Sequence, residues 1–203
     1  MHWDFLIFSQ GKYMQFKRTK IEDVILIEPA IHGDERGYFV ETFRQDKLEE
    51  FLGFKVYFCQ DNESKSSRGV LRGLHYQLAP AAQTKLVRVI KGRVLDVAVD
   101  IREGSPTFGQ HVAVELSEEN KRQLFVPRGF AHAFVVLEDD TVFAYKVDNY
   151  YSPENDRGIS FSDPEIGIDW TIETFELKLS DKDTKQPKLK DADLFNYGDN
   201  LYV

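Results

Sequence analysis

Residues 85–101 read KLVRVIKGRVLDVAVDI, which is two apolar, β-branched runs joined by Lys91-Gly92. Such runs are typical of buried strands, and the Lys-Gly pair between them predicts a hairpin turn. Gly104-Ser105-Pro106 and Glu118-Glu119-Asn120 predict two further hairpin turns. The predicted strands are 24–27, 38–43, 56–59, 85–90, 94–101, 111–116, 123–126, 133–137 and 141–147. Many short strands with regular turns predict a mainly β sandwich or barrel.

Two other segments complete this expectation. Residues 44–52 contain Asp-Lys-Leu-Glu-Glu, which are good helix formers, and predict a short helix. From Asp163 onward the chain is richer in Lys, Asp and Pro. We expect this part to wrap the barrel with short helices or extended strands.

The length and the charge restrict the class of protein. A chain of 203 residues can bury one sizeable core, and no repeat or linker divides it, so we expect one domain over 1–203. Met14 would itself serve as a start, so residues 1–13 are either an extension or a start-site choice. With 34 acidic against 26 basic residues and a net charge of -8, the composition argues against a nucleic acid partner.

Sequence features also bear on localisation. The apolar run Phe5-Leu6-Ile7-Phe8 is too short for a signal peptide core, and no basic segment precedes it. No apolar run approaches the length of a membrane span, so we expect no membrane partner. The single cysteine, Cys59, excludes an internal disulfide. The expected location is the cytoplasm.

Two histidine segments stand out for chemistry, RGLHYQ at 72–77 and PRGFAHAF at 127–134. Strand-like runs flank both segments, so His75 and His132 could converge within one small barrel. A metal site on these segments would need a second imidazole close after His75, where the sequence has Gln77. Because transition metals usually take at least three nitrogen, sulfur or carboxylate ligands, we expect no metal here.

Proton transfer fits the remaining residues better. A base that removes a carbon-bound proton needs a near-neutral imidazole, a carboxylate that fixes its tautomer, and a donor for the enolate oxygen. Asp183 or Asp100 could orient His75, and Lys85 could meet the enolate. Tyr145 could donate a proton from the opposite face, although a strand tyrosine is more often a core residue.

From residue 19 to about 192 the sequence resembles the dTDP-4-dehydrorhamnose 3,5-epimerase family. Matching motifs occur in one order along the chain. They are GDERGYF at 33–39, QDN at 60–62, GVLRGLHYQ at 69–77, KLVRV at 85–89, DVAVDIR at 96–102, SPTFG at 105–109, VPRGFAH at 126–132, YK at 145–146, NYYSP at 149–153 and S-x-K-D at 180–183. The resemblance implies a cupin-like jelly-roll barrel with short flanking helices, no cofactor, and a dTDP-sugar substrate.

The resemblance also implies roles for individual residues. His75 matches the catalytic base, Asp183 its carboxylate partner, and Tyr145 the acid on the opposite face. Lys85 matches the residue near the 4-keto oxygen of the sugar. Asp181, two residues before Asp183, is expected to be a solvated loop charge.

Further matches concern substrate binding. Arg36, with the strand 38–43, is implied to reach the neighbouring subunit's site, which makes a homodimer with strand exchange the expected assembly. Arg36, Arg72 and Lys182 could together hold the diphosphate dianion. The positions implied to line the pocket or lie near the substrate are Gln60, Asn62, Arg72, His132 and Tyr151.

Three alternatives stay open from the sequence. The first is a 3-epimerase, because relatives that epimerise only C3 keep the same base and acid. The sequence therefore does not distinguish inversion of C3 alone from inversion of C3 and C5. A non-catalytic barrel that binds a nucleotide sugar, or a metal-dependent cupin oxygenase or isomerase, would share the fold. One departure from the family is Ala133, where Gly often follows the second histidine.

Overall fold

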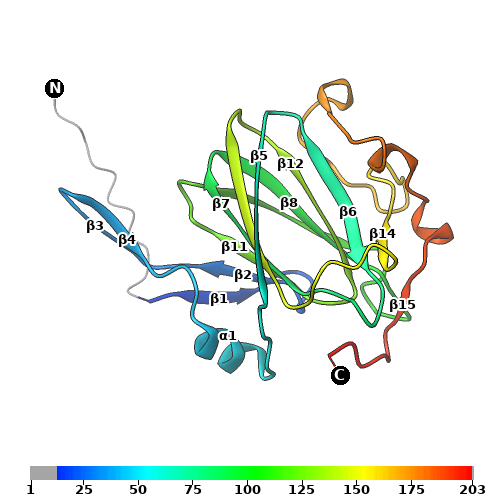
Figure 1. Cartoon of the computed structure of the whole chain (residues 1–203), viewed down its shortest axis with the longest axis horizontal. Coiled ribbons are helices and arrows are strands. Elements are labelled where there is room, and N and C mark those ends of the chain that lie inside the picture. The colour runs from blue at the N-terminus through cyan, green and yellow to red at the C-terminus, as the bar shows by residue number, and fades with distance from the viewer. Residues whose placement is uncertain (1–12, 203) are drawn as a thin grey trace.

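The computed structural model describes residues 13–202, which form two antiparallel sheets packed face to face (Figure 1). The proposed extension 1–13 lies outside the described residues except for Tyr13. The six-stranded sheet is ordered β1 (Gln15–Arg18), β2 (Ile25–Glu28), β11 (Gln123–Val126), β7 (Lys85–Lys91), β13 (Thr141–Val147) and β5 (Gln60–Ser66). The five-stranded sheet is ordered β10 (His111–Ser117), β8 (Arg93–Asp100), β12 (Phe130–Val136), β6 (Leu71–Gln77) and β14 (Asp156–Gly158).

Smaller elements surround the two sheets. A hairpin of β3 (Ile31–Asp34) and β4 (Gly37–Val40) extends away from them on the left of Figure 1, and β9 (Arg102–Glu103) pairs in parallel with β15 (Phe195–Asn196). The helices are α1 (Gln45–Leu52) and the 3₁₀ turns η1 (Thr174–Glu176), η2 (Asp183–Lys185) and η3 (Leu189–Asp191). The expected cupin-like jelly roll with short flanking helices is confirmed.

The core forms in three apolar layers because strand side chains alternate between faces. Between the sheets, Val87 and Val89 of β7 pack with Phe143 of β13 and Phe134 of β12. The outer face of the five-stranded sheet packs against the C-terminal segment, including Trp170. Leu48 of α1 belongs to the third layer, against the outer face of the six-stranded sheet. The C-terminal segment therefore wraps the barrel as expected.

Two of the three predicted hairpin turns are wrong. β7 and β8 lie in different sheets, so Lys91-Gly92 carries the chain from one sheet to the other. Gly92 has φ 78°, and a Cβ there would lie 2.3 Å from Thr141 Oγ1, which explains the glycine. The turn at 118–120 likewise connects β10 to β11 across the sheets. Only the turn at 104–106 belongs to a true antiparallel pair, β8 with β10.

Most predicted strands are confirmed, with two errors around β5. Residues 56–59 form no strand, and Val56 is buried beside α1 instead. The strand begins at Gln60 and runs through QDNESKS, a polar sequence that periodicity does not reveal. The predicted strand 38–43 is shorter in the structure, ending at Val40, and the predicted helix 44–52 begins at Gln45.

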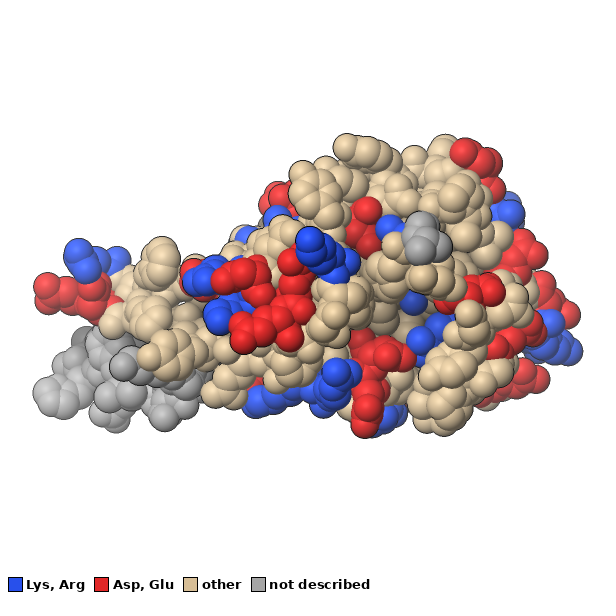
Figure 2. Space-filling model, turned by 90° about the horizontal axis from the view of Figure 1, so that it is seen from below, with Lys and Arg blue, Asp and Glu red and all other residues tan. Residues whose placement is uncertain are grey.

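The charged side chains are mixed over the surface. Figure 2 shows Lys and Arg interspersed with Asp and Glu on the face seen from below. Within residues 13–202, no helix has both the length and the apolar character needed to cross a bilayer.

Candidate active site

A cavity of about 560 Å³ opens between the two sheets, within the size range of small-molecule sites. Strands of both sheets and the segment 178–183 line it. Seven of the residues singled out from the sequence contribute to its wall. They are Asn62, Arg72, His75, Lys85, His132, Tyr145 and Asp183.

His75, on β6, pairs with Asp183 in the wall of the cavity. Its Nε2 lies 2.5 Å from Asp183 Oδ1, and the His75 side chain is 30% exposed whereas Asp183 is 4% exposed. Ser180 Oγ donates to the other oxygen of Asp183 at 2.8 Å. Burial raises the pKa of Asp183, but the hydrogen bonds from His75 and Ser180 outweigh it, so the net pKa is lowered. The carboxylate therefore stays ionised and fixes the imidazole.

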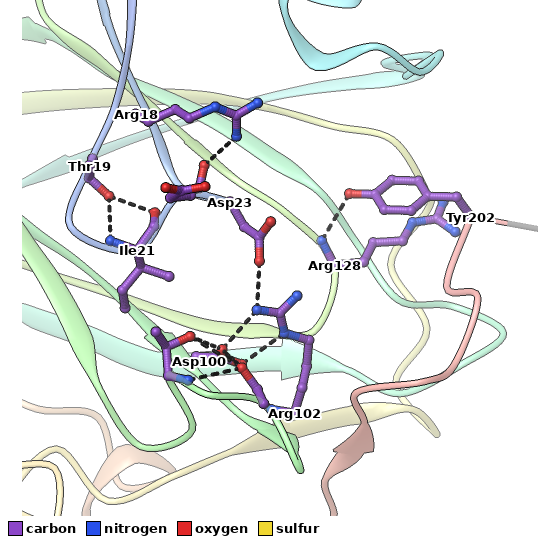
Figure 3. A network of polar contacts seen from close by, with 11 residues as sticks. Arg18, Thr19, Ile21, Asp23, Asp100, Arg102, Arg128 and Tyr202 are labelled. Atoms are coloured by element: carbon purple, nitrogen blue, oxygen red, sulfur yellow. Dashed lines mark hydrogen bonds and ion pairs between the residues drawn. The ribbon is translucent and has the colours of Figure 1, made fainter.

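Asp100, the alternative partner of His75, is hydrogen-bonded to other residues. The Asp100 carboxylate accepts hydrogen bonds from Arg102, Ser105 and Thr107 at the far end of β8. Figure 3 shows Asp100 and Arg102 within this separate polar network. Assigning Asp100 to His75 is therefore wrong, and Asp183 takes that position.

Lys85, at the start of β7, is half-buried beside His75. Its Nζ donates to the backbone carbonyl of His75 at 3.4 Å. Burial lowers the pKa of Lys85 to about 8, although Asp96 and Asp156 partly oppose the shift. A lysine with this pKa remains largely protonated near neutral pH and can donate to an oxygen in the cavity.

Tyr145, on β13, lines the cavity from the six-stranded sheet, whereas His75 lines it from the five-stranded sheet. Burial raises the pKa of Tyr145, with the positive charge of Arg72 acting in the opposite direction. The phenol therefore keeps its proton at neutral pH. An imidazole and a phenol thus line one cavity from opposite sheets.

His132 is the register partner of His75 on the neighbouring strand β12. Its Nε2 lies 3.0 and 2.9 Å from the two oxygens of Asp96, which is fully buried on β8. Burial lowers the pKa of His132, against the pull of Asp96. Sequence reasoning missed Asp96, although the alternation in DVAVD already placed an acidic residue on a strand face.

The predicted binding residues on β5 and β6 lie at the cavity or beside it. Arg72 Nη2 donates to Ser66 Oγ at 3.2 Å, and Gln60 Nε2 donates to Asn62 Oδ1 at 2.8 Å. Asn62 pairs directly opposite Tyr145 in the β5–β13 ladder. Gln60 does not itself line the cavity, but it fixes the amide orientation of Asn62, which does.

Lys182 and Tyr151 meet outside the cavity lining, through Asp156 of β14. The Lys182 ammonium forms an ion pair with Asp156 Oδ2, and the Tyr151 hydroxyl donates to the same oxygen at 3.0 Å. Asp156 was not identified from the sequence, where it carries no local signal. Asp181 is exposed, as expected for a loop charge.

Arg36 lies on the β3–β4 hairpin and forms an ion pair with Asp34. Both side chains are exposed, and the hairpin projects away from the sheets in Figure 1. The residues expected to hold the diphosphate together, Arg36, Arg72 and Lys182, are therefore not brought together within one chain.

The acidic and imidazole groups of the cavity are arranged in pairs. Among residues 13–202, no group of three or more His, Cys, Asp and Glu side chains is placed to hold a metal ion. The donor set at each histidine is one imidazole with one carboxylate, which suits proton transfer better than metal binding.

Comparison with known proteins agrees with this geometry. The family model described as dTDP-4-dehydrorhamnose 3,5-epimerase matches residues 18–191. The dTDP-4-dehydrorhamnose 3,5-epimerase of Shigella flexneri is 56% identical over 182 residues, covering 90% of this chain and 99% of that protein. The dTDP-6-deoxy-D-glucose-3,5-epimerase of Legionella pneumophila, solved with dTDP-4-keto-L-rhamnose, superposes with a TM-score of 0.88. It is 49% identical and covers 92% of this chain and 100% of that one.

A more distant structural relative is a 3'-monoepimerase from Streptomyces bikiniensis in complex with dTDP-quinovose. It is 36% identical, with a TM-score of 0.80, and covers 85% of this chain and 86% of that one. The family match spans most of the chain and contains all the cavity residues described above. The chain belongs to the dTDP-4-dehydrorhamnose 3,5-epimerase family, a family of isomerases.

Proposed function

We propose that this chain epimerises dTDP-4-dehydro-6-deoxy-D-glucose at C3 and C5, giving dTDP-4-dehydro-L-rhamnose. The observation that carries this proposal is one cavity lined by the His75–Asp183 pair, Lys85 and Tyr145. A module that only binds a nucleotide sugar has no need of a base and an acid on opposite walls.

The chemistry follows from the 4-keto group of the substrate. The ketone acidifies the protons on C3 and C5, so His75 removes a proton and leaves an enolate. Lys85 donates to the enolate oxygen, and Tyr145 returns a proton from the opposite face. A well-placed acid or base contributes about a hundredfold to ten-thousandfold in rate, and stabilisation of the enolate adds a few kcal/mol. Because no electrons are gained or lost overall, the reaction needs no redox cofactor.

The diphosphate needs positive charge near the cavity mouth. Arg72 already lines the cavity, and its guanidinium can hold two phosphate oxygens. Lys182 follows in the wall segment, but it is paired with Asp156 in the structure. In this proposal the bound diphosphate replaces Asp156 as the partner of the Lys182 ammonium. Tyr151, which shares Asp156 with Lys182, then lies close to the bound nucleotide.

A homodimer with strand exchange would supply Arg36. An isolated two-stranded hairpin is marginally stable in water, yet β3–β4 exposes Tyr38 (60%) and Phe39 (69%). Packing on a second copy would cover these rings and would bring Arg36 to the partner's cavity. We also take the chain as one epimerase domain that acts in the cytoplasm, in keeping with its single, free Cys59.

Mixing two inactive variants tests the dimer. A chain with Arg36→Ala keeps His75, and a chain with His75→Asn keeps Arg36. If Arg36 serves the neighbouring site, random mixed dimers contain one complete site each, and activity recovers to about a quarter of the wild-type value. Activity that stays at the sum of the two separate variants would rule out sharing of the site.

The product decides between the main reading and its alternative, a 3-epimerase. Incubation of the wild-type chain with dTDP-4-dehydro-6-deoxy-D-glucose, followed by borohydride reduction and sugar analysis, should yield L-rhamnose. A sugar inverted only at C3 would support the 3-epimerase. Unchanged substrate that still binds the protein would support the non-catalytic barrel.

A further inference from the structure

The segment after the last strand returns to the barrel through Tyr202. Its hydroxyl accepts a hydrogen bond from the Arg128 backbone N–H at 3.2 Å and lies 2.9 Å from Thr84 Oγ1. Figure 3 shows the Tyr202 side chain reaching from the C-terminal segment to the backbone of Arg128. The ring packs 4.9 Å from Phe54, centroid to centroid, and the Arg128 guanidinium lies 5.1 Å from the ring centroid. Tyr202 lies beyond residues 18–191, which the family model matches.

The residues that hold Tyr202 also hold one another. Arg128 Nε donates to Asp148 Oδ2 at 3.1 Å, and Arg128 Nη1 donates to the Leu201 carbonyl at 2.5 Å. Asp148 Oδ1 accepts from the Thr84 backbone N–H at 2.6 Å. The network joins the residue before β7, the residue after β13, and the loop that leads into β12. Tyr202 therefore fastens three strand ends at one place.

Those strand ends carry the groups of the cavity. Thr84 is fully buried and directly precedes Lys85, whose register partner is Val147, the residue before Asp148. Tyr145 lies further along the same strand β13. Among the described residues, the Lys85 Nζ has one hydrogen-bond partner, the His75 carbonyl at 3.4 Å. A single long hydrogen bond holds the ammonium only weakly. The position of the ammonium is therefore set mainly by the backbone from which the side chain starts, at Thr84 and Lys85.

We propose that Tyr202 is a positioning residue for Lys85, acting through Thr84 and the start of β7. This inference rests on the proposed epimerase function and adds a residue that does not touch the substrate. A displacement of a catalytic group by about 1 Å costs up to about a hundredfold in rate, so a small shift of β7 is measurable. The burial that lowers the pKa of Lys85 depends on the position of its side chain at the start of β7.

Tyr202→Phe tests the proposal because it removes the hydroxyl and keeps the ring between Phe54 and Arg128. We expect kcat to fall about three- to tenfold with KM nearly unchanged, because substrate contacts remain while the Lys85 ammonium moves. The alkaline limb of the kcat profile should move to higher pH, since a loosened β7 admits water and the pKa of Lys85 rises. Thr84→Val removes the partner hydroxyl and should reproduce both effects. Thr84→Ser keeps a hydroxyl and should retain the wild-type kcat and pH profile.

Tyr197→Phe is the matched control. Tyr197 lies on the same C-terminal segment and packs against the guanidinium of Arg102, away from Thr84. It should keep the wild-type kcat and pH profile. If Tyr202→Phe matches Tyr197→Phe in both readouts, Tyr202 does not position Lys85.

A readout without turnover separates this inference from the proposed function. In protein labelled with ¹³C at the lysine Cε, the Lys85 signal, assigned by its loss in Lys85→Arg, should titrate near pH 8. In Tyr202→Phe it should titrate at higher pH. A wild-type chain without turnover would reject the epimerase function, whereas an unshifted Lys85 titration in Tyr202→Phe would reject the positioning role.

Discussion

His75 and His132 are register partners on β6 and β12, yet each Nε2 is held by a different carboxylate. Asp183 approaches His75 from η2, outside the two main sheets, whereas Asp96 holds His132 from the neighbouring strand β8. The His75 side chain is 30% exposed and the His132 side chain 7%. Two imidazoles side by side therefore have different uses: the first can exchange protons with a ligand, and the second is fixed in the wall.

Replacing His75 by Asn should abolish proton exchange and leave nucleotide binding nearly intact. The imidazole contacts Asp183 rather than a basic group, so its loss removes the base without removing charge from the diphosphate site. Asp183→Asn keeps the shape but not the ionised acceptor, and we expect a loss of about a hundredfold or more in kcat. Single-turnover kinetics and calorimetric titration with dTDP measure the two effects. Exchange that persists in His75→Asn would move the base to another residue.

Replacing Asp96 by Ala should destabilise the fold. It leaves the ring N–H of the buried His132, which its lowered pKa keeps neutral, without an acceptor, and an unsatisfied buried donor costs about 1–3 kcal/mol. Asp96→Asn keeps an acceptor for the ring N–H and should cost less. Urea unfolding compares both with Asp181→Ala, an exposed loop control. Equal midpoints for Asp96→Ala and Asp181→Ala would mean that the pair contributes nothing to stability.

The activity should fall at alkaline pH because of Lys85. Its pKa is about 8, so well below that pH nearly all molecules carry the ammonium that can donate a proton. The ammonium is lost as the pH rises through this value. The kcat should therefore fall by about tenfold for each pH unit well above the pKa. In Lys85→Arg the side chain stays charged, so the limb near pH 8 should disappear while the plateau is lowered. A limb that remains near pH 8 in Lys85→Arg belongs to another group.

Gly73→Ala should prevent normal packing beside the site. Gly73 has φ +139°, and an added Cβ would lie 2.2 Å from the Ala133 Cβ. The backbone of β6 cannot move away without shifting His75, so we expect a loss of more than about 3 kcal/mol in stability. Thermal unfolding and soluble yield measure it, with Gly198→Ala, where a Cβ meets nothing within 4 Å, as the control. Similar melting temperatures for the two variants would contradict the close approach.

The apolar strands were predictable from sequence, but their partners were not. β7, β8 and β10 to β13 carry β-branched runs whose burial follows from composition. Periodicity does not say which strand lies beside which, so it predicts hairpins at 91–92 and 118–120, where the chain crosses between the sheets. Strand β5 was not predicted because its sequence, QDNESKS, has no apolar residue. The apolar residues of 56–59 pack in the layer that contains α1 and do not belong to a strand.

The site was predictable where motifs carried it and not where distant residues meet. His75, Lys85, Tyr145 and Asp183 do share one cavity. Spacing alone left Asp183 and Asp100 open, because nothing local to either residue tells which one the chain folds toward His75. Asp96, Asp156 and Ser180 were missed for the same reason, since their partners lie on other elements.

Solvent exchange measures the central claim most directly, that one base and one acid act on the carbons beside the ketone. The wild-type chain is incubated in heavy water with dTDP-4-dehydro-6-deoxy-D-glucose, and deuterium is located by NMR and mass spectrometry. We predict deuterium at both C3 and C5, lost at both in His75→Asn. Deuterium at C3 alone would reduce the enzyme to a 3-epimerase, and deuterium at neither carbon would contradict the account.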